Sequence, residues 1–202
     1  MADTNRRAQL LAAAREVFAS KGYHDAKVDD IVAAADVAKG TFYLYFKDKR
    51  SVFSELVDDV FARLTSAILR VDINADIESQ IRHNIRAVLH VLLDEPELTR
   101  ILLTSAQSVD PAFQKKIRSF YGDVRFLMEK ALADGQKMDV VAPGDPKLLT
   151  LFTIGAIKEV VLELALEKSR APREQLVDAV FSILQNGYLR VKTPKSPARR
   201  AH

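Results

Sequence analysis

The chain of 202 residues contains no cysteine. This absence excludes disulfide frameworks, thiolate-bound zinc, iron–sulfur clusters and a cysteine nucleophile. Long apolar runs are also scarce: the uncharged stretch between Lys147 and Lys158 has ten residues, and a helix that crosses a bilayer needs roughly twice that length. Near the N-terminus, the apolar stretch from Leu10 to Ala14 is too short for a signal peptide. We therefore expect a cytoplasmic protein without membrane contact.

Residues that carry catalysis or bind metals are few. His83 and His90 stand one heptad apart, with Asp94 one turn further on, whereas two metal ligands on a helix usually stand four residues apart. The sequence has no glycine-rich phosphate loop, nucleophile elbow or kinase signature. We expect no metal or other cofactor, and we expect that the protein is not an enzyme.

The spacing of apolar residues indicates helices along nearly the whole chain. Hydrophobic residues make up 48% and charged residues 28%, the balance of a globular protein. Apolar positions recur every three or four residues and not every two, which predicts an all-α fold. Caps and breaks at proline, glycine and aspartate predict about nine helices, near residues 4–20, 28–35, 38–45, 48–69, 76–94, 97–107, 111–135, 145–168 and 173–191.

Basic residues are concentrated at the C-terminus. The net charge of +3 owes much to residues 190–202, which hold five basic residues and no acidic one. Residues 192–202 also contain two prolines and show no periodicity, so we expect a basic, disordered tail. Such a tail either only improves solubility or adds a contact to phosphate.

Residues 148–166 are apolar on nearly every side, which is typical of a helix that is buried all round. One interpretation is that a partner subunit covers this helix in a homodimer built on a four-helix bundle; the other is a core within one chain. The residues predicted for the dimer interface are apolar or aromatic members of the last two helices: Phe152, Val161, Leu164, Val177, Phe181, Leu184 and Tyr188.

Residues 27–49 have the pattern of a helix-turn-helix, in which two short helices are joined by a tight turn. Asp36 stands where the turn needs a left-handed residue, which aspartate tolerates better than most. A small wedge of core between the two helices is predicted from Ile31, Ala35, Val37 and Phe42. The second helix is then free to protrude.

Polar and aromatic groups dominate the protruding helix. Lysine and phenol groups commonly donate to the DNA backbone, and a glycine lets a helix terminus approach phosphate closely. The residues predicted to contact DNA are Lys39, Gly40, Thr41, Tyr43 and Tyr45, with Lys49 as a clamp on a neighbouring phosphate. The alternative is a helical hairpin with aromatic side chains at its surface and solvated lysines.

The motifs within residues 6–61 resemble the DNA-binding domain of the tetracycline-repressor (TetR) family of transcriptional regulators. The similar segments are 7–18, Gly22-Tyr23, Val28-Asp29-Asp30-Ile31, Val37-Ala38-Lys39-Gly40-Thr41-Phe42-Tyr43 and Tyr45-Phe46-Lys47-Asp48-Lys49. The resemblance implies that residues 1–50 form the DNA-binding domain and that helix 48–70 links it to a ligand-binding and dimerisation domain, 51–191. It also implies DNA contacts for Lys27 and Val28. Ala26-Lys27 and Ala38 depart from the serine or threonine caps common in the family, and a lysine cannot cap as a hydroxyl does.

The resemblance further implies a homodimeric repressor that binds double-stranded DNA at a near-palindromic operator and is released by a small, largely apolar effector. A transcriptional activator, or a DNA-binding protein of chromosome organisation that recruits a protein partner, would have a similar sequence. The effector of such proteins binds inside the second domain. The candidate residues either line that site or simply pack the core: Arg86, Leu89, Gln107, Phe113, Ile117, Phe120, Tyr121, Val124, Arg125, Met128 and Phe152.

Overall fold

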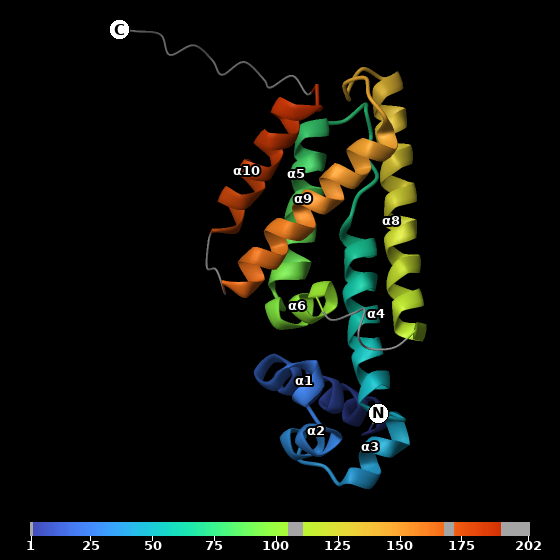
Figure 1. Cartoon of the computed structure of the whole chain (residues 1–202), viewed down its shortest axis with the longest axis vertical. Helices are drawn as coiled ribbons and strands as arrows, with labels where there is room; N and C mark the ends of the chain where they lie inside the picture. Colours follow the sequence, from blue (N-terminus) through green and yellow to red (C-terminus); the bar gives the residue numbers. More distant parts are fainter. Residues whose placement is uncertain (1, 105–110, 168–171, 191–202) are drawn as a thin grey trace, which may run out of the picture.

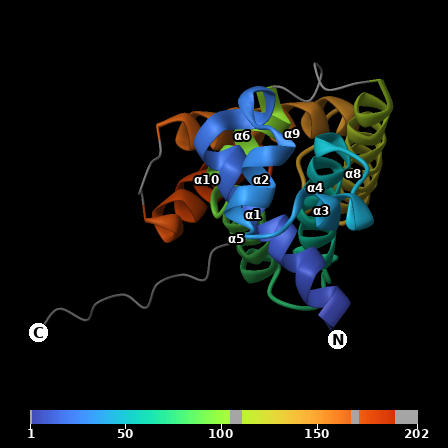
Figure 2. The ribbon, with the colours of Figure 1, turned by 90° about the horizontal axis from the view of Figure 1, so that it is seen from below.

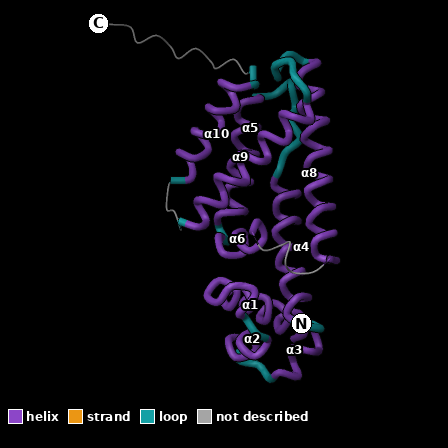
Figure 3. The backbone as a smooth tube through the Cα atoms, viewed as in Figure 1, coloured by secondary structure: helices purple, strands orange, loops and turns teal. Residues whose placement is uncertain are grey.

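The computed structural model describes residues 2–104, 111–167 and 172–190, and within them the protein is all-α, as predicted (Figure 3). Helices α1, α2 and α3 form a small unit, here called the head, and α4 runs from it into the remaining helices, the body (Figure 1). The helices are α1 (Ala2–Asp25), α2 (Val28–Ala34), α3 (Lys39–Tyr45), α4 (Lys49–Ala67), α5 (Ile77–Leu93), α6 (Pro96–Thr104), α8 (Pro111–Lys137), α9 (Pro146–Leu166) and α10 (Arg173–Gly187).

Local chemistry explains where several helices begin and end. The carboxylate of Asp48 accepts the backbone N–H of Ser51 at 2.7 Å, which caps α4. Gly22 has a φ of 76°, so the first helix breaks near its predicted end before a last turn carries it to Asp25. Helix α10 ends at Gly187 and not near residue 191, because Leu189 forms an isolated antiparallel bridge with Val141. Pairing with another segment replaces the last helical turn.

One hydrophobic core joins the head to the body. The ring of Phe53 in α4 packs edge-on against Phe18 of α1, with 5.5 Å between ring centroids, and lies 5.3 Å from the ring of Phe113 in α8. All three rings are buried, together with Leu98 and Ile101 of α6. The head therefore completes its core with side chains of the body. This core, here called the first core, extends across the boundary expected at residue 50.

A second core lies between α5, α8, α9 and α10. Val161, Val177 and Phe181 are at most 1% exposed within this core, so the prediction that they form a dimer interface is wrong: their own chain covers them. Leu164, Leu184 and Tyr188 also pack against it. Helix α9 is not buried all round in the single chain, because its other face leaves Leu148, Leu151, Phe152, Val160 and Leu166 exposed.

An ionic network, here called the ionic junction, connects head and body beside the first core. Arg15 of α1 reaches the carboxylates of Asp59 at 2.7 Å and Glu95 at 3.4 Å. Arg63 of α4 binds the same two carboxylates, at 3.3 and 2.5 Å. Since Glu95 lies in the turn before α6, these four residues connect α1, α4 and the body.

The segment after α4 is fixed to α5 by two side-chain amides. The amide of Asn84 accepts from the backbone N–H of Leu69 and donates to its carbonyl, at 2.7 and 2.8 Å. The amide of Gln80 binds Asp72 in the same two-point manner, at 2.7 and 2.9 Å. The body therefore holds the far end of α4.

Candidate nucleic-acid interface

Helices α2 and α3 form the predicted helix-turn-helix at the end of the molecule away from α9 and α10 (Figure 1). Figure 2 views the molecule from this end. Asp36 in the turn has a φ of 49°, which confirms the left-handed position. Ile31 and Phe42 are fully buried between the helices, and Ala35 is 3% exposed. Burial of Phe42 fixes which side of α3 faces outward.

The outward side, here called the α3 face, consists of Lys39, Gly40, Tyr43 and Leu44, all exposed. These residues stand one helical turn apart in pairs, so they share one side of the helix. Tyr43 is 52% exposed and Leu44 is 81% exposed. Sequence reasoning missed Leu44, because an apolar residue gives no signal of a polar partner.

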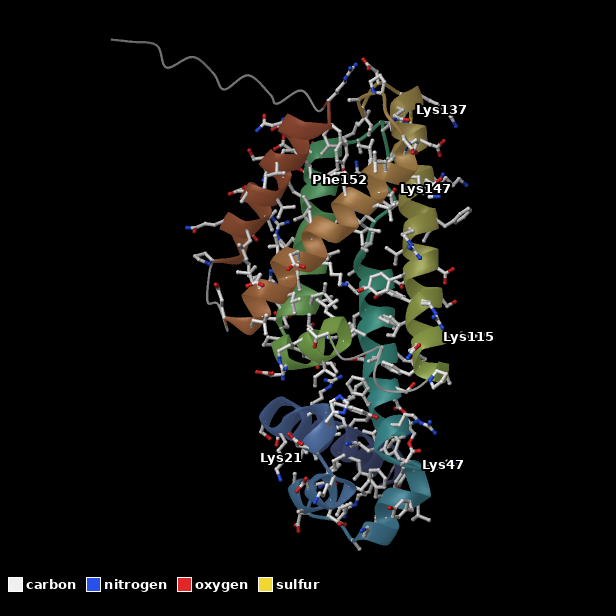
Figure 4. All side chains as sticks on the ribbon, in the orientation of Figure 1. Lys21, Lys47, Lys115, Lys137, Lys147 and Phe152 are labelled. Carbon is white, nitrogen blue, oxygen red and sulfur yellow. The ribbon has the colours of Figure 1, made fainter. Side chains whose placement is uncertain are left out.

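Two lysines are exposed on α3 or shortly after it. Lys47, two residues after the end of α3, is exposed at the head end of the molecule and was also absent from the predicted contacts (Figure 4). Lys39 forms an ion pair with Asp29 of α2, with 2.6 Å between Nζ and Oδ1. The hydrogen bond from Lys39 to Asp29, together with the attraction of that carboxylate, raises the pKa of Lys39. The ammonium therefore stays charged beside the α3 face.

The start of α2 shows how the chain replaces a hydroxyl cap. Lys27 is exposed and gives no side-chain cap, but its backbone N–H donates to the carboxylate of Asp30 at 2.9 Å. Lys21 binds the same carboxylate at 2.7 Å, and this hydrogen bond is the main cause that lowers the pKa of Asp30. The Lys27 side chain therefore takes no part in the cap, and the residue is exposed. Val28 is half-buried against the first core.

Lys49 has a structural role that contradicts its prediction as a phosphate clamp. Its ammonium donates to the backbone carbonyls of Tyr23, His24 and Ala26, at 2.6, 3.1 and 2.7 Å. An ammonium has three N–H donors, so these carbonyls engage all of them. Burial lowers the pKa of Lys49, and its Nζ lies 4.7 Å from the centre of the Tyr23 ring. Lys49 holds the end of α1 against α4.

The other two predicted contacts on α3 lie at the edge of its outward face. Thr41 is half-buried, and Tyr45 is half-buried against the first core. Exposed positions in the head thus concentrate lysines, a phenol and one aliphatic side chain on α3 and the start of α2. Donors of this kind contact the phosphates of DNA, and side chains on a protruding helix reach base edges in the major groove.

The predicted effector residues separate into two groups. Phe113, Ile117, Phe120 and Tyr121 of α8 line or join the first core, where the Phe120 ring stacks on Phe61 of α4 at 3.6 Å. Burial raises the pKa of Tyr121. Leu89 and Met128 belong to the second core. Val124, which stands between Tyr121 and Met128 in the sequence, is half-buried.

Other predicted effector residues point elsewhere. Arg86 binds Glu174 of α10 at 2.6 Å, and Arg125 is exposed. Phe152 is 71% exposed on α9, so it does not line an internal site (Figure 4). Gln107 and the basic tail lie outside the described residues.

Within residues 2–104, 111–167 and 172–190, no group of three or more histidine, cysteine, aspartate or glutamate side chains could hold a metal ion. None of the helices in these ranges is long and apolar enough to cross a membrane.

A helix-turn-helix head that shares a core with an all-helical body defines a DNA-binding transcriptional regulator. Sequence models of the "Bacterial regulatory proteins, tetR family" and of a "Tetracyclin repressor-like, C-terminal domain" match residues 10–56 and 74–162. A Mycobacterium bovis protein, "Uncharacterized HTH-type transcriptional regulator Mb0790c", is 31% identical over 76% of this chain and 71% of its own length. The chain belongs to the TetR family of bacterial transcriptional regulators.

Relatives and solved structures that span most of the chain agree with this assignment. The "HTH-type transcriptional repressor DhaR" of Mycobacterium sp. (strain GP1) is 24% identical over 91% of this chain and 94% of its own. The fatty acid degradation regulator FadR from Bacillus halodurans superimposes with a TM-score of 0.74 at 25% identity, covering 93% and 97% of the two chains. FadR from Bacillus subtilis, solved with stearoyl-CoA, gives a TM-score of 0.69 at 24% identity over 87% and 96%.

Proposed function

We propose that the protein is a homodimeric repressor that leaves a near-palindromic operator when a small, largely apolar effector binds. The observation that carries the proposal is the α3 face, a protruding surface that includes Lys39, together with the exposed lysines Lys27 at the start of α2 and Lys47 after α3. Two such faces in a dimer would lie about 34 to 36 Å apart to read two half-sites in successive major grooves. Because the proposed target is DNA, we propose that the protein acts in the cytoplasm.

The exposed apolar face of α9 supports the dimer. Phe152 is 71% exposed, and its neighbours Gly155 and Ala156 are small and exposed, so another helix could approach closely. Ile183 of α10 is also 71% exposed. A twofold axis through this surface would bring the same patch of both subunits together. Phe152, Val160 and Ile183 replace the buried Val161, Val177 and Phe181 as the interface residues we propose.

The shared core and the ionic junction support control through head spacing. An effector that binds better to a dimer with wrongly spaced heads must weaken DNA binding by the same factor. Helix α4 contacts the head at Lys49 and ends in a segment clamped to α5, so a shift inside the body would move the head. We propose that residues 1–50 bind DNA and that residues 51–191 bind the effector and dimerise.

The apolar side chains of α8 support an apolar effector. Ile117, Phe120, Tyr121 and Val124, with Leu89 and Met128, are the lining residues we propose, and the Tyr121 hydroxyl could orient a polar end. Since a FadR of similar fold was solved with stearoyl-CoA, long-chain acyl-CoA is the first effector class to test.

The decisive experiment is selection of bound sequences from random duplex DNA with the purified protein, followed by titration of the selected site at two salt concentrations. We expect a near-palindrome, a stoichiometry of two chains per site and a steep loss of affinity with salt. Addition of stearoyl-CoA should then release the complex. Failure to enrich any sequence with a folded, ligand-free protein would overturn the proposal. Enrichment without release would retain DNA binding and reject this effector class.

A further inference from the structure

Leu44 is the most exposed large hydrophobic side chain among the described residues, at 81%. It lies on α3 between Phe42, which is fully buried, and Tyr45, which packs against the first core. The backbone of α3 therefore holds Leu44 in a fixed outward direction. Its neighbours on the α3 face are Gly40, which has no side chain, and Tyr43.

The surroundings of Leu44 favour a polyanion as the occupant of this surface. Lys39 and Lys47 are exposed on either side of it along the chain, and Lys27 is exposed at the start of α2. Two carboxylates also lie near α3: Asp29 binds Lys39, and Asp36 is exposed in the turn before the helix. The exposed lysines, together with the place of α3 in a helix-turn-helix, commit the α3 face to double-stranded DNA.

The side chain of Leu44 can recognise only an apolar feature of that DNA. It has no donor or acceptor, so it cannot bind phosphate or the polar edge of a base. In the major groove the apolar feature is the C5-methyl group of thymine, which aliphatic side chains contact. We propose that Leu44 is a specificity-determining residue that packs against a thymine methyl in each half-site. This inference rests on the proposed function, because it requires α3 to enter the major groove.

Replacing thymine by uracil tests the contact directly, because uracil lacks only the methyl group. In the selected operator, each thymine of a half-site and its symmetry mate are replaced by deoxyuridine in turn, and the affinities of wild-type protein and Leu44→Ala are measured. At one position, the replacement should weaken wild-type binding about fourfold for each methyl contact that is lost. This factor corresponds to the free energy gained by burying one methyl group. Leu44→Ala should bind thymine and uracil duplexes equally, because the partner of the methyl is gone.

Controls separate this contact from other effects of the base change. Any change in DNA stiffness from the missing methyl affects both proteins and cancels in the comparison. Leu127→Ala removes a leucine that is 62% exposed on α8, outside the head, and should keep the full uracil penalty. Since Leu44 is exposed, the far-UV spectrum and melting temperature of Leu44→Ala should match the wild type.

Three outcomes would overturn the inference. If every uracil duplex binds the wild type equally well, no methyl is read. If the penalty persists in Leu44→Ala, another side chain makes the contact, and its loss in Tyr43→Ala would assign the contact to Tyr43. If selection yields no binding site at all, the proposed function fails and the inference fails with it, whereas the first two outcomes leave that function intact.

Discussion

The Nζ atom of Lys39 lies 2.6 Å from Oδ1 of Asp29, although both side chains are more than half exposed. This ion pair connects α3 to α2 on the side of the head that would meet DNA. An aspartate in that place repels phosphate and competes with it for the lysine. The pair therefore weakens the attraction between the head and DNA of any sequence. It also fixes the direction of the Lys39 side chain.

Removing the charge of Asp29 should strengthen binding to DNA of any sequence. In Asp29→Asn, Lys39 is released to pair with phosphate, so the slope of log affinity against log salt should steepen by about one ion. Fluorescence anisotropy with operator and random duplexes at several salt concentrations measures this. Asp123→Asn, an exposed change on α8 in the body, is the control. Unchanged or weaker binding by Asp29→Asn would show that the pair does not compete with phosphate.

Lys47 and Lys49 should respond differently to the same substitution. Lys47→Met should fold normally and lower the salt slope by about one, as expected for a lost phosphate contact. Lys49→Met should lower the free energy of unfolding by about 1 to 3 kcal/mol, because three backbone carbonyls lose a charged donor. Denaturant unfolding and salt titration separate the two effects. A reduced salt slope in fully stable Lys49→Met would restore Lys49 as a phosphate contact.

Aspartate at exposed apolar positions tests the proposed dimer surface. Phe152→Asp and Ile183→Asp should each shift the sedimentation of the protein toward the monomer, with dimerisation at least about tenfold weaker, since an unpaired carboxylate would be buried. Phe126→Asp on α8, where the ring is 68% exposed, serves as the matched control and should remain a dimer. The far-UV spectra of the three variants should match that of the wild type, because none of these residues is buried in the single chain. A dimer that survives both interface changes would move the interface elsewhere.

The ionic junction should contribute modestly to stability and respond to salt. Glu95 is the least exposed member, at 19%, and binds both arginines. Glu95→Gln should lower the free energy of unfolding by about 1 kcal/mol at low salt, and 0.5 M NaCl, on the order of a 4 Å screening length, should narrow this difference. Glu97→Gln, which affects a pair within α6, is the comparison. Equal loss at all salt concentrations would point to packing and not to charge.

The sequence predicted the helices and the turn well, because their causes are local. Asp36 and Phe42 follow from turn chemistry and from the three-to-four spacing of apolar residues, and the structure confirms both. Lys49 could not be assigned, because its partners are carbonyls of residues 23–26, and a backbone carbonyl leaves no mark in the sequence.

The two faces of α9 show that the burial of a side chain, too, can leave no mark in the sequence. Phe152 and Val161 are both apolar members of one helix, yet the first is 71% exposed and the second is fully buried. Periodicity cannot distinguish them when every side of a helix is apolar. Only the arrangement of α5, α6 and α8 against α9 determines which side the chain itself covers.

The contact between Phe53 and Phe113 has a consequence for protein engineering. A fragment that ends after α4 would expose the aromatic surface that α6 and α8 normally cover, so it should precipitate or bind nonspecifically. A chimera that carries this head on a foreign scaffold would need to import Leu98, Ile101, Phe113 and Ile117 as well. The unit that can be transplanted is therefore defined by the side chains that complete the core of the head, and not by the residue at which one helix ends and the next begins.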